Sequence, residues 1–174
     1  MAQDSAFATV ALPHLDAAFN LARWLIGDRA DAEDVVQEAM VRALTYFPSF
    51  RGENARAWML QIVRNAAYGA LKARPGQRFV SIDNVDGPDA IAELPDPSAD
   101  PENALIRARD FQRIDGLIAR LPVELRETLV LRELEELSYR EIAQVTETPI
   151  GTVMSRLWRA RRFLTEAVKK GTTA

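Results

Sequence analysis

Apolar residues recur every three or four positions through the first 75 residues, which is the period of an amphipathic helix rather than of a strand. The pattern predicts a helix over residues 6–26, with Pro13 as the position where it breaks. Asp31 is expected to cap a second helix that continues to about residue 46. After a loop at residues 48–53, Asn54 is expected to cap a third helix that continues to about residue 72.

The second helix separates apolar from polar residues. The residues expected to face inward are Val35, Ala39, Met40, Ala43 and Leu44. The opposite face carries Asp34, Gln37, Glu38 and Arg42. Asp34, Gln37 and Glu38 stand at i, i+3 and i+4, so their side chains project together.

The pattern near the C-terminal end predicts a helix-turn-helix within residues 121–164. Ser138 and Glu141 form a capping box, so a helix should begin at Tyr139. Its residues Ile142, Ala143 and Val145 should face inward. Thr148 and Pro149 are expected to cap and begin the last helix. Its buried stripe should comprise Val153, Leu157, Ala160 and Leu164.

Between these halves the composition changes. Residues 76–105 contain one basic and seven acidic side chains, and prolines and glycines are frequent between residues 75 and 100. This composition predicts an extended acidic linker, after which Asp100 and Pro101 should start a helix that continues to about Arg120. We therefore expect an all-α protein with two small helical domains, at residues 6–75 and 101–170, joined by a flexible linker at residues 76–100.

The net charge of −3 would argue against nucleic acid, but the charge is segregated along the chain. Residues 149–174 carry six cations and one acid. On the last helix, Ser155, Arg159 and Arg162 repeat opposite the apolar stripe, with Thr152 and Arg156 close by. Such a face suits a helix in a DNA major groove, because arginine can reach guanine edges or phosphates there. The alternative is a solvated basic face on a helical bundle.

The third helix combines aromatic, basic and amide side chains. These are Trp58, Arg64, Asn65, Tyr68, Lys72 and Arg74, with Phe50 in the preceding loop. Aromatic rings beside arginine and asparagine can accept unstacked bases and hold phosphates. Trp58, Ile62 and Ala66 are spaced four apart, so we expect Trp58 to belong to the core and assign binding to Asn65 and the basic residues.

Composition excludes several classes of chemistry. There is no cysteine, and the single histidine, His14, cannot form a zinc site alone and is expected on a helix surface. No apolar run approaches the ~20 residues of a membrane span, and the N-terminus lacks signal-peptide features, so we expect a cytoplasmic protein without membrane insertion. No metal constellation, phosphate-cradling glycine loop or paired nucleophile and base is evident, so we expect no cofactor and no enzymatic activity.

Three segments resemble the sigma-70 family of bacterial RNA polymerase sigma factors, in particular the extracytoplasmic function (ECF, group 4) members, which have only sigma regions 2 and 4. The segments are DAEDVVQEAMVRAL at residues 31–44, FRGENARAWMLQIVRNAA at residues 50–67, and residues 121–164, which include LSYREIA and GTVMSRLWRARR. The resemblance covers nearly the whole chain in the family's order. It implies region 2 in the first domain, region 4 in the second, and promoter-specific transcription initiation with core polymerase.

The resemblance also implies roles for single residues. Asp34, Gln37 and Glu38 match positions that dock on the largest polymerase subunits, beta and beta-prime, and Arg42 is included with them. Asn65 matches the pocket for a base flipped out of the minus-ten element. The other residues implied at that element are Phe50, Arg64, Tyr68, Lys72 and Arg74. The residues implied at the minus-thirty-five element are Thr152, Ser155, Arg156, Trp158, Arg159 and Arg162.

Two departures from the family pattern affect these expectations. Met154 stands where relatives often carry a basic residue, so the promoter sequence cannot be carried over. Tyr68 and Gly69 replace polar residues common after the asparagine, and a glycine there should weaken the helix by about 1 kcal/mol relative to alanine.

The family further implies a stress response controlled by a separate anti-sigma factor. One alternative is an autonomous helix-turn-helix regulator that binds symmetric half-sites as a dimer. Another is a protein that only sequesters other factors through its amphipathic helices. The first leaves Asp34, Gln37, Glu38 and the Asn65 region unexplained, and the second leaves the basic face of the last helix without a role.

Overall fold

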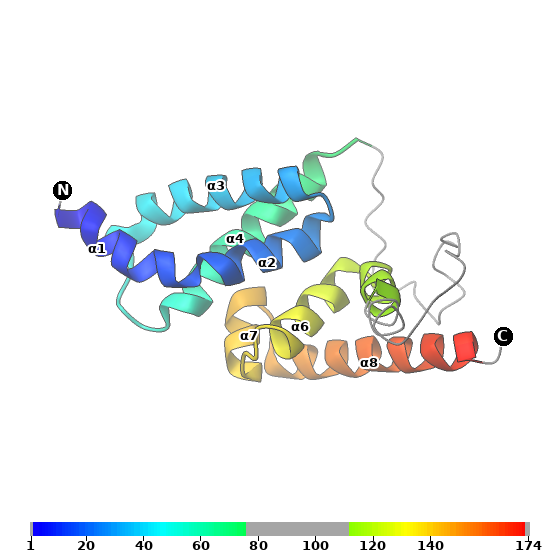
Figure 1. Ribbon diagram of the computed structural model, residues 1–174. Helices are drawn as coiled ribbons and strands as arrows, with labels where there is room; N and C mark the ends of the chain where they lie inside the picture. The colour runs from blue at the N-terminus through cyan, green and yellow to red at the C-terminus, as the bar shows by residue number, and fades with distance from the viewer. Residues whose placement is uncertain (1, 76–111, 173–174) are drawn as a thin grey trace, which may run out of the picture.

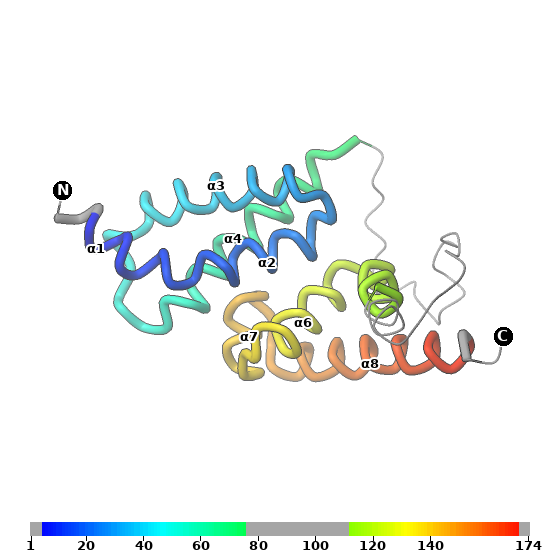
Figure 2. Tube along the Cα trace, in the orientation of Figure 1, coloured from blue at the N-terminus to red at the C-terminus, as the bar shows by residue number. Residues whose placement is uncertain are grey.

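The computed structural model describes residues 2–75 and 112–172, and within these ranges every regular element is helical. Figure 1 shows the elements in two layers, with α1 to α4 in one and α6 to α8 in the other. The predicted linker and the start of the helix expected at Asp100 lie outside the described residues (Figure 2), so both stay predictions. The all-α fold is confirmed for the described part of the chain.

The first predicted helix is three elements: α1 (Ala2–Ala11), the 3-10 turn η1 (Leu12–His14) and α2 (Leu15–Ile26). The predicted break at Pro13 is confirmed, because proline cannot donate the backbone hydrogen bond that an α-helix interior requires. His14 is half-buried rather than fully on the surface, and burial, with a smaller contribution from the Arg56 charge, lowers its pKa.

Helix α3 (Arg29–Tyr46) begins earlier than predicted. Its cap is Asp28 rather than Asp31, because the Asp28 side chain accepts a hydrogen bond from the Asp31 backbone N–H at 3.0 Å. Val35, Ala39 and Ala43 are buried as expected. The inward placement of Leu44 was wrong, since that side chain is 39% exposed.

Helix α4 (Ala55–Ala73) follows the 3-10 turn η2 (Phe47–Ser49) and has the predicted cap, Asn54, whose side chain accepts from the Ala57 N–H at 3.1 Å. It packs against both α2 and α3. The residues of α4 that fill this core are Ala57, Met59, Leu60, Val63, Ala66, Ala67 and Leu71. Trp58 packs against the core but remains half-buried.

The described part of the second layer consists of a helical segment at residues 112–119, then α6 (Val123–Glu133), α7 (Tyr139–Thr146) and α8 (Ile150–Thr172). The capping box is confirmed, because Glu141 N donates to Ser138 Oγ at 3.2 Å and Ser138 N donates to Glu141 Oε2 at 2.7 Å. Helix α8 begins after Pro149 rather than at it, and the Thr148 hydroxyl shares a 2.8 Å hydrogen bond with Thr146.

The buried stripe of α8 is close to the predicted one. Val153, Leu157 and Ala160 are buried, whereas Phe163 is buried in place of Leu164, which only packs against the edge of the core. This stripe lies against α6 and α7, so the helix-turn-helix is held as one unit. The opposite face of α8 is left toward solvent.

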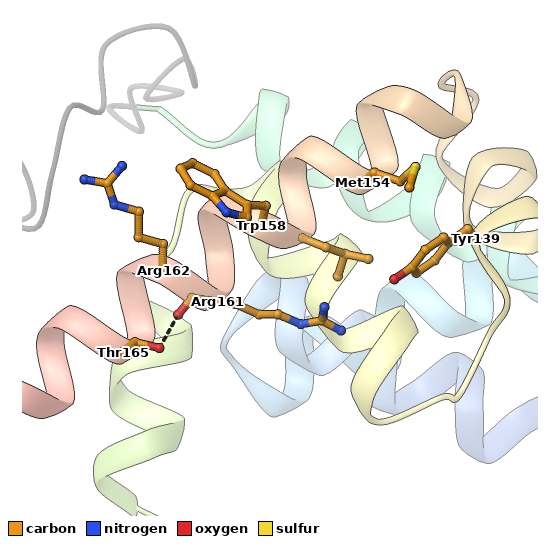
Figure 3. A pocket seen from close by; sticks show the side chains of 7 residues that line it. Tyr139, Met154, Trp158, Arg161, Arg162 and Thr165 are labelled. Carbon is orange, nitrogen blue, oxygen red and sulfur yellow. Dashed lines mark hydrogen bonds between the residues drawn. The ribbon is translucent and has the colours of Figure 1, made fainter.

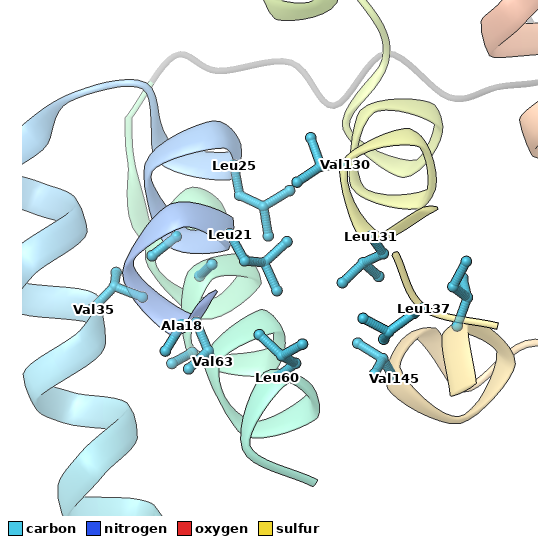
Figure 4. Packing of buried hydrophobic residues seen from close by; sticks show 14 of the residues in the cluster. Ala18, Leu21, Leu25, Val35, Leu60, Val63, Val130, Leu131, Leu137 and Val145 are labelled. Carbon is cyan, nitrogen blue, oxygen red and sulfur yellow. The ribbon is translucent and has the colours of Figure 1, made fainter. Parts of the chain in front are cut away.

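The two layers share one apolar core. Helix α2 packs on α6, and α4 packs on α7. Figure 4 shows Leu21, Leu25 and Leu60 of the first layer facing Val130, Leu131, Leu137 and Val145 of the second. The surfaces of the two layers that face each other are therefore covered in this structure.

Candidate functional site

One candidate surface is the exposed face of α3. Asp34, Gln37 and Glu38 are all exposed and project from the side of α3 opposite its buried residues. Arg42 forms an ion pair with Glu38 one helical turn away. The structure therefore brings the four predicted residues together on one face.

This face has an apolar centre that sequence reasoning missed. Val41 is 67% exposed and lies one turn after Gln37 and Glu38, between them and Thr45. A β-branched apolar side chain this exposed in the middle of a helix has no role in the core. Its position three and four residues after two predicted contacts is the signal that could have identified it.

A second surface lies along α4. Asn65 is exposed and accepts a weak 3.4 Å hydrogen bond from Arg64. Phe50 is half-buried and packs on Trp58, with ring centroids 4.7 Å apart, and on Phe47 at 6.2 Å. This aromatic cluster holds the loop before α4 in place. Phe50 and Trp58 therefore stabilise the fold, and part of each side chain remains exposed.

The remaining predicted residues of α4 differ in availability. Lys72 is exposed near the end of the helix. Arg74, the residue after the end of α4, pairs with Asp31 and donates to the Ile26 backbone oxygen at 3.3 Å. The Arg64 guanidinium lies 4.0 Å from the centroid of the Tyr68 ring. Lys72 and Asn65 are thus the accessible members, while Arg64, Tyr68 and Arg74 are engaged within the protein.

A third surface is the outer face of α8. Ser155 is exposed, Thr152 and Arg159 are half-exposed, and Arg162 pairs with Glu166 at 2.7 Å. Arg162 also lies 5.4 Å from the Trp158 ring centroid, which is a cation–π distance. Trp158 is 61% exposed and Met154 is 52% exposed, so this face is apolar as well as basic.

An open groove runs along this face of α8. Figure 3 shows its lining side chains, with Tyr139 of α7 at one end and Trp158 and Arg162 at the other. Arg161 at the groove pairs with Glu133 of α6 at 2.6 Å. Sequence reasoning placed Trp158 here but missed Tyr139 and Arg161. Tyr139 lines the groove because α7 packs beside α8, and Arg161 is a residue of α8 itself.

The structure also places a buried carboxylate between predicted binding residues. Glu127 of α6 is fully buried and accepts from Arg64 Nε at 2.9 Å, from Arg64 Nη2 at 3.2 Å, and from Arg156 Nη1 at 3.4 Å. The side chains of both arginines are only 14% exposed. Arg156 therefore faces inward here, unlike its neighbours Ser155 and Arg159.

The environment of this cluster shifts several pKa values. Burial raises the pKa of Tyr68, and the nearby Glu127 charge adds to that increase. Burial also raises the pKa of Glu127, while hydrogen bonding and charge from Arg64 oppose it. Burial alone would lower the pKa of Arg64, but the hydrogen bond and charge of Glu127 outweigh it and raise that pKa. Arginine keeps its proton at neutral pH in any case, so the cluster always contains two cations.

Comparison with known proteins places both layers of the chain in one family. Residues 11–75 match the family described as Sigma-70 region 2, and residues 111–164 match Sigma-70, region 4. The ECF RNA polymerase sigma-E factor of Haemophilus influenzae is 35% identical over 145 residues, which are 81% of this chain and 76% of that protein. This chain belongs to the ECF sigma factors of the sigma-70 family.

Further relatives support the membership of this sigma factor in the family. The RNA polymerase sigma-H factor of Pseudomonas aeruginosa is 34% identical over 94% of this chain and 86% of its own length. Among solved structures, the sigma factor RpoE of Bartonella quintana, in complex with the anti-sigma factor NepR, is 29% identical with a TM-score of 0.69. That alignment covers 94% of this sigma factor and 97% of the other chain, so it includes both layers.

Two further findings bear on what this sigma factor could hold. Among residues 2–75 and 112–172, no group of three or more acidic or histidine side chains is placed to bind a metal ion. In the same ranges no helix is both long and apolar enough to cross a bilayer.

Proposed function

We propose that this sigma factor binds core RNA polymerase and directs it to promoters through two DNA elements. The observation that supports the proposal most strongly is the division of its predicted binding residues into three separate surfaces, on α3, α4 and α8. An autonomous regulator would need only the α8 surface, and the α3 face would then have no partner.

The α3 face is the proposed polymerase contact. Exposed Gln37 and Glu38 provide polar groups, and Val41 provides an apolar centre that loses water on binding. Asp34 and Arg42 lie at the edge of the same face. The partner surface would lie on the two largest polymerase subunits, beta and beta-prime, as the family resemblance implies.

The α4 surface is the proposed site of minus-ten recognition and promoter opening. Asn65 is exposed and has both a donor and an acceptor for a base edge. Phe50 is held beside Trp58 in a fixed aromatic cluster near the start of the same helix. Unstacking a base costs a few kcal/mol, which such a preformed site can offset. The protein contributes binding energy and no chemical catalysis.

The outer face of α8 is the proposed reader of the minus-thirty-five element. Ser155 and Arg159 point toward solvent, and Arg162 is only loosely held by an exposed pair with Glu166. Met154 is exposed between them and could contact a thymine methyl group but not a guanine edge. The promoter sequence read by this protein should therefore differ from that of relatives with a basic residue there.

We also propose that an anti-sigma factor controls this protein in response to stress. The support is the solved relative in complex with NepR, which aligns with both layers of this chain. The exposed Trp158 and Met154 and the open groove beside them offer an apolar surface on which a partner could bury area.

The test is transcription from a promoter library with purified core polymerase, with and without this protein. Initiation should depend on the protein and should be lost in the double variant Gln37→Ala/Glu38→Ala. Glu33→Ala is the matched control, because it removes the same charge from the flank of α3, where Glu33 only pairs with exposed Arg29. No stimulation of polymerase, together with tight duplex binding by the protein alone, would overturn the proposal in favour of an autonomous regulator.

A further inference from the structure

We infer that this sigma factor holds itself in a closed form, in which the Glu127 carboxylate occupies two arginines that would otherwise bind promoter DNA. The inference rests on the proposed function, which assigns Arg64 to the minus-ten element and Arg156 to the minus-thirty-five element. It goes beyond that function because it concerns the free protein, before any partner binds.

The contacts of Glu127 are those that a DNA phosphate would make. Arg64 donates to both Glu127 oxygens through Nε and Nη2, at 2.9 and 3.2 Å. This two-pronged geometry is the one in which arginine also binds phosphate. Arg156 donates to one of the same oxygens at 3.4 Å. One carboxylate on α6 thus occupies an arginine from each half of the molecule.

Burial of the three side chains limits the access of other anions to Arg64 and Arg156. Glu127 is 0% exposed, and the side chains of Arg64 and Arg156 are each 14% exposed. Little of either arginine side chain is therefore available to a phosphate group in this arrangement. DNA can use Arg64 only after α6 and α4 separate, so closure of the two layers and DNA binding by this arginine compete.

Two more carboxylates of the second layer reinforce the closed form. Glu135, itself 7% exposed, accepts from Arg56 of α4 at 2.7 Å and from Asn20 of α2 at 2.5 Å. Glu141 accepts from Asn54, the cap of α4, at 2.7 Å. Three acids from the second layer therefore contact polar residues of the first.

Apolar packing supplies the adhesion between the layers. Leu21 and Leu60 of the first layer and Leu131 and Val145 of the second are at most 1% exposed, and they meet across the contact in Figure 4. Ion pairs buried in such a contact add little net stability, but removing one partner leaves a charge buried without compensation. Glu127 is therefore the residue whose loss should open the molecule, because Arg64 and Arg156 would be left as two adjacent cations.

The first test measures the separation of the layers directly. The chain has no cysteine, so dyes can be attached at Thr45→Cys on α3 and Gln144→Cys on α7, both exposed positions. Energy transfer should be high in the otherwise unchanged protein and should fall in E127Q. E133Q is the control, because it removes the same charge from α6 at an exposed pair with Arg161 inside the second layer.

The same proteins are then titrated with a fluorescein-labelled oligo(dT) strand at low salt. Because loss of the Glu127 charge favours the open form, E127Q should bind on the order of tenfold more tightly, while E133Q should change little. A folded E127Q protein, judged by its thermal melt, with unchanged energy transfer would overturn the inference. An equal gain in affinity in E127Q and E133Q would also overturn the inference, because it would result from the loss of one negative charge alone.

A second test does not depend on the folding of E127Q. Asn54→Cys and Glu141→Cys replace a hydrogen-bonded pair that joins the layers, and a disulfide-containing bismaleimide can link them reversibly. The linked protein should not support transcription with core polymerase, and reduction of the linker should restore it to the level of the unlinked double variant. Equal transcription in the linked and reduced proteins would overturn the inference while leaving the proposed function intact. Absence of transcription in the unchanged protein would instead count against the proposed function, and energy transfer would still decide whether Glu127 closes the molecule.

Discussion

Replacing Asn65 by alanine should separate promoter opening from promoter binding. Asn65 is exposed and its one described hydrogen bond, from Arg64, is 3.4 Å long. Losing that contact should cost the fold almost nothing, and alanine in the interior of α4 should gain about 0.5 kcal/mol of helix propensity. The variant should therefore unfold no earlier than the unchanged protein.

The expected loss lies in the open complex. An asparagine that hydrogen-bonds a base edge contributes about 1–3 kcal/mol of recognition. That energy is available only after the base leaves the duplex. Its loss should therefore lower the equilibrium constant for open-complex formation by roughly fivefold to 150-fold and leave the initial complex nearly unchanged. Permanganate reactivity of promoter thymines measures opening, and gel-shift titration at low temperature measures initial binding.

Lys72→Ala is the matched control for this prediction. Lys72 is exposed on the same helix and is proposed to contact phosphate, so its loss should weaken both steps equally and reduce the salt dependence by about one phosphate contact. If Asn65→Ala behaves like Lys72→Ala, with equal losses in binding and opening, the assignment of Asn65 to a flipped base is refuted.

Three further predictions follow from local geometry. Ser138→Ala removes the side-chain half of the capping box and should lower the free energy of unfolding by about 1 kcal/mol in urea titration, whereas Thr45→Ala, at an exposed helix position, should have a smaller effect. The hydrogen bond from the Ser138 backbone N–H is the main reason that the pKa of Glu141 lies below its ordinary value of 4.5. The ionised carboxylate therefore stabilises the fold above pH 4.5, and this stabilisation is lost as the pH falls through the lowered pKa. Glu141→Gln should reduce the acid sensitivity of folding, and an acid unfolding transition identical to that of the unchanged protein would contradict this prediction. Val41→Asp should weaken binding to core polymerase, measured by fluorescence anisotropy, without shifting the melting temperature. Unchanged affinity would show that Val41 does not contact the polymerase.

Local sequence signals predicted the helices well. The capping box at Ser138, the cap at Asn54 and the break at Pro13 each depend on residues within one turn, and all three are confirmed. The errors are also local. Asp28 and Asp31 are both competent caps three residues apart, and the pattern alone could not decide that Asp28 is used.

The shared exposed face of the candidate polymerase-contact residues was predictable for the same reason. A helical period places Asp34, Gln37 and Glu38 on one side of α3 whatever the rest of the chain does. The sequence pattern did not identify Val41, because a single valine is equally compatible with a buried position. Its exposure is decided by the packing of α3 on α2 and α4, which a local pattern does not contain.

The closed arrangement could not be inferred from any local pattern. Glu127 and Arg64 are 63 residues apart, and Glu141 and Asn54 are 87 apart, with the residues of the predicted linker between them. In the sequence, Glu127 is one acid among several on an amphipathic helix, and Arg64 is one cation beside aromatic residues. Only the packing of α2 on α6 and of α4 on α7 brings them together away from water. Arg64 and Arg156, both predicted to bind DNA, are thereby paired with a carboxylate in this structure, which their positions in the sequence do not indicate.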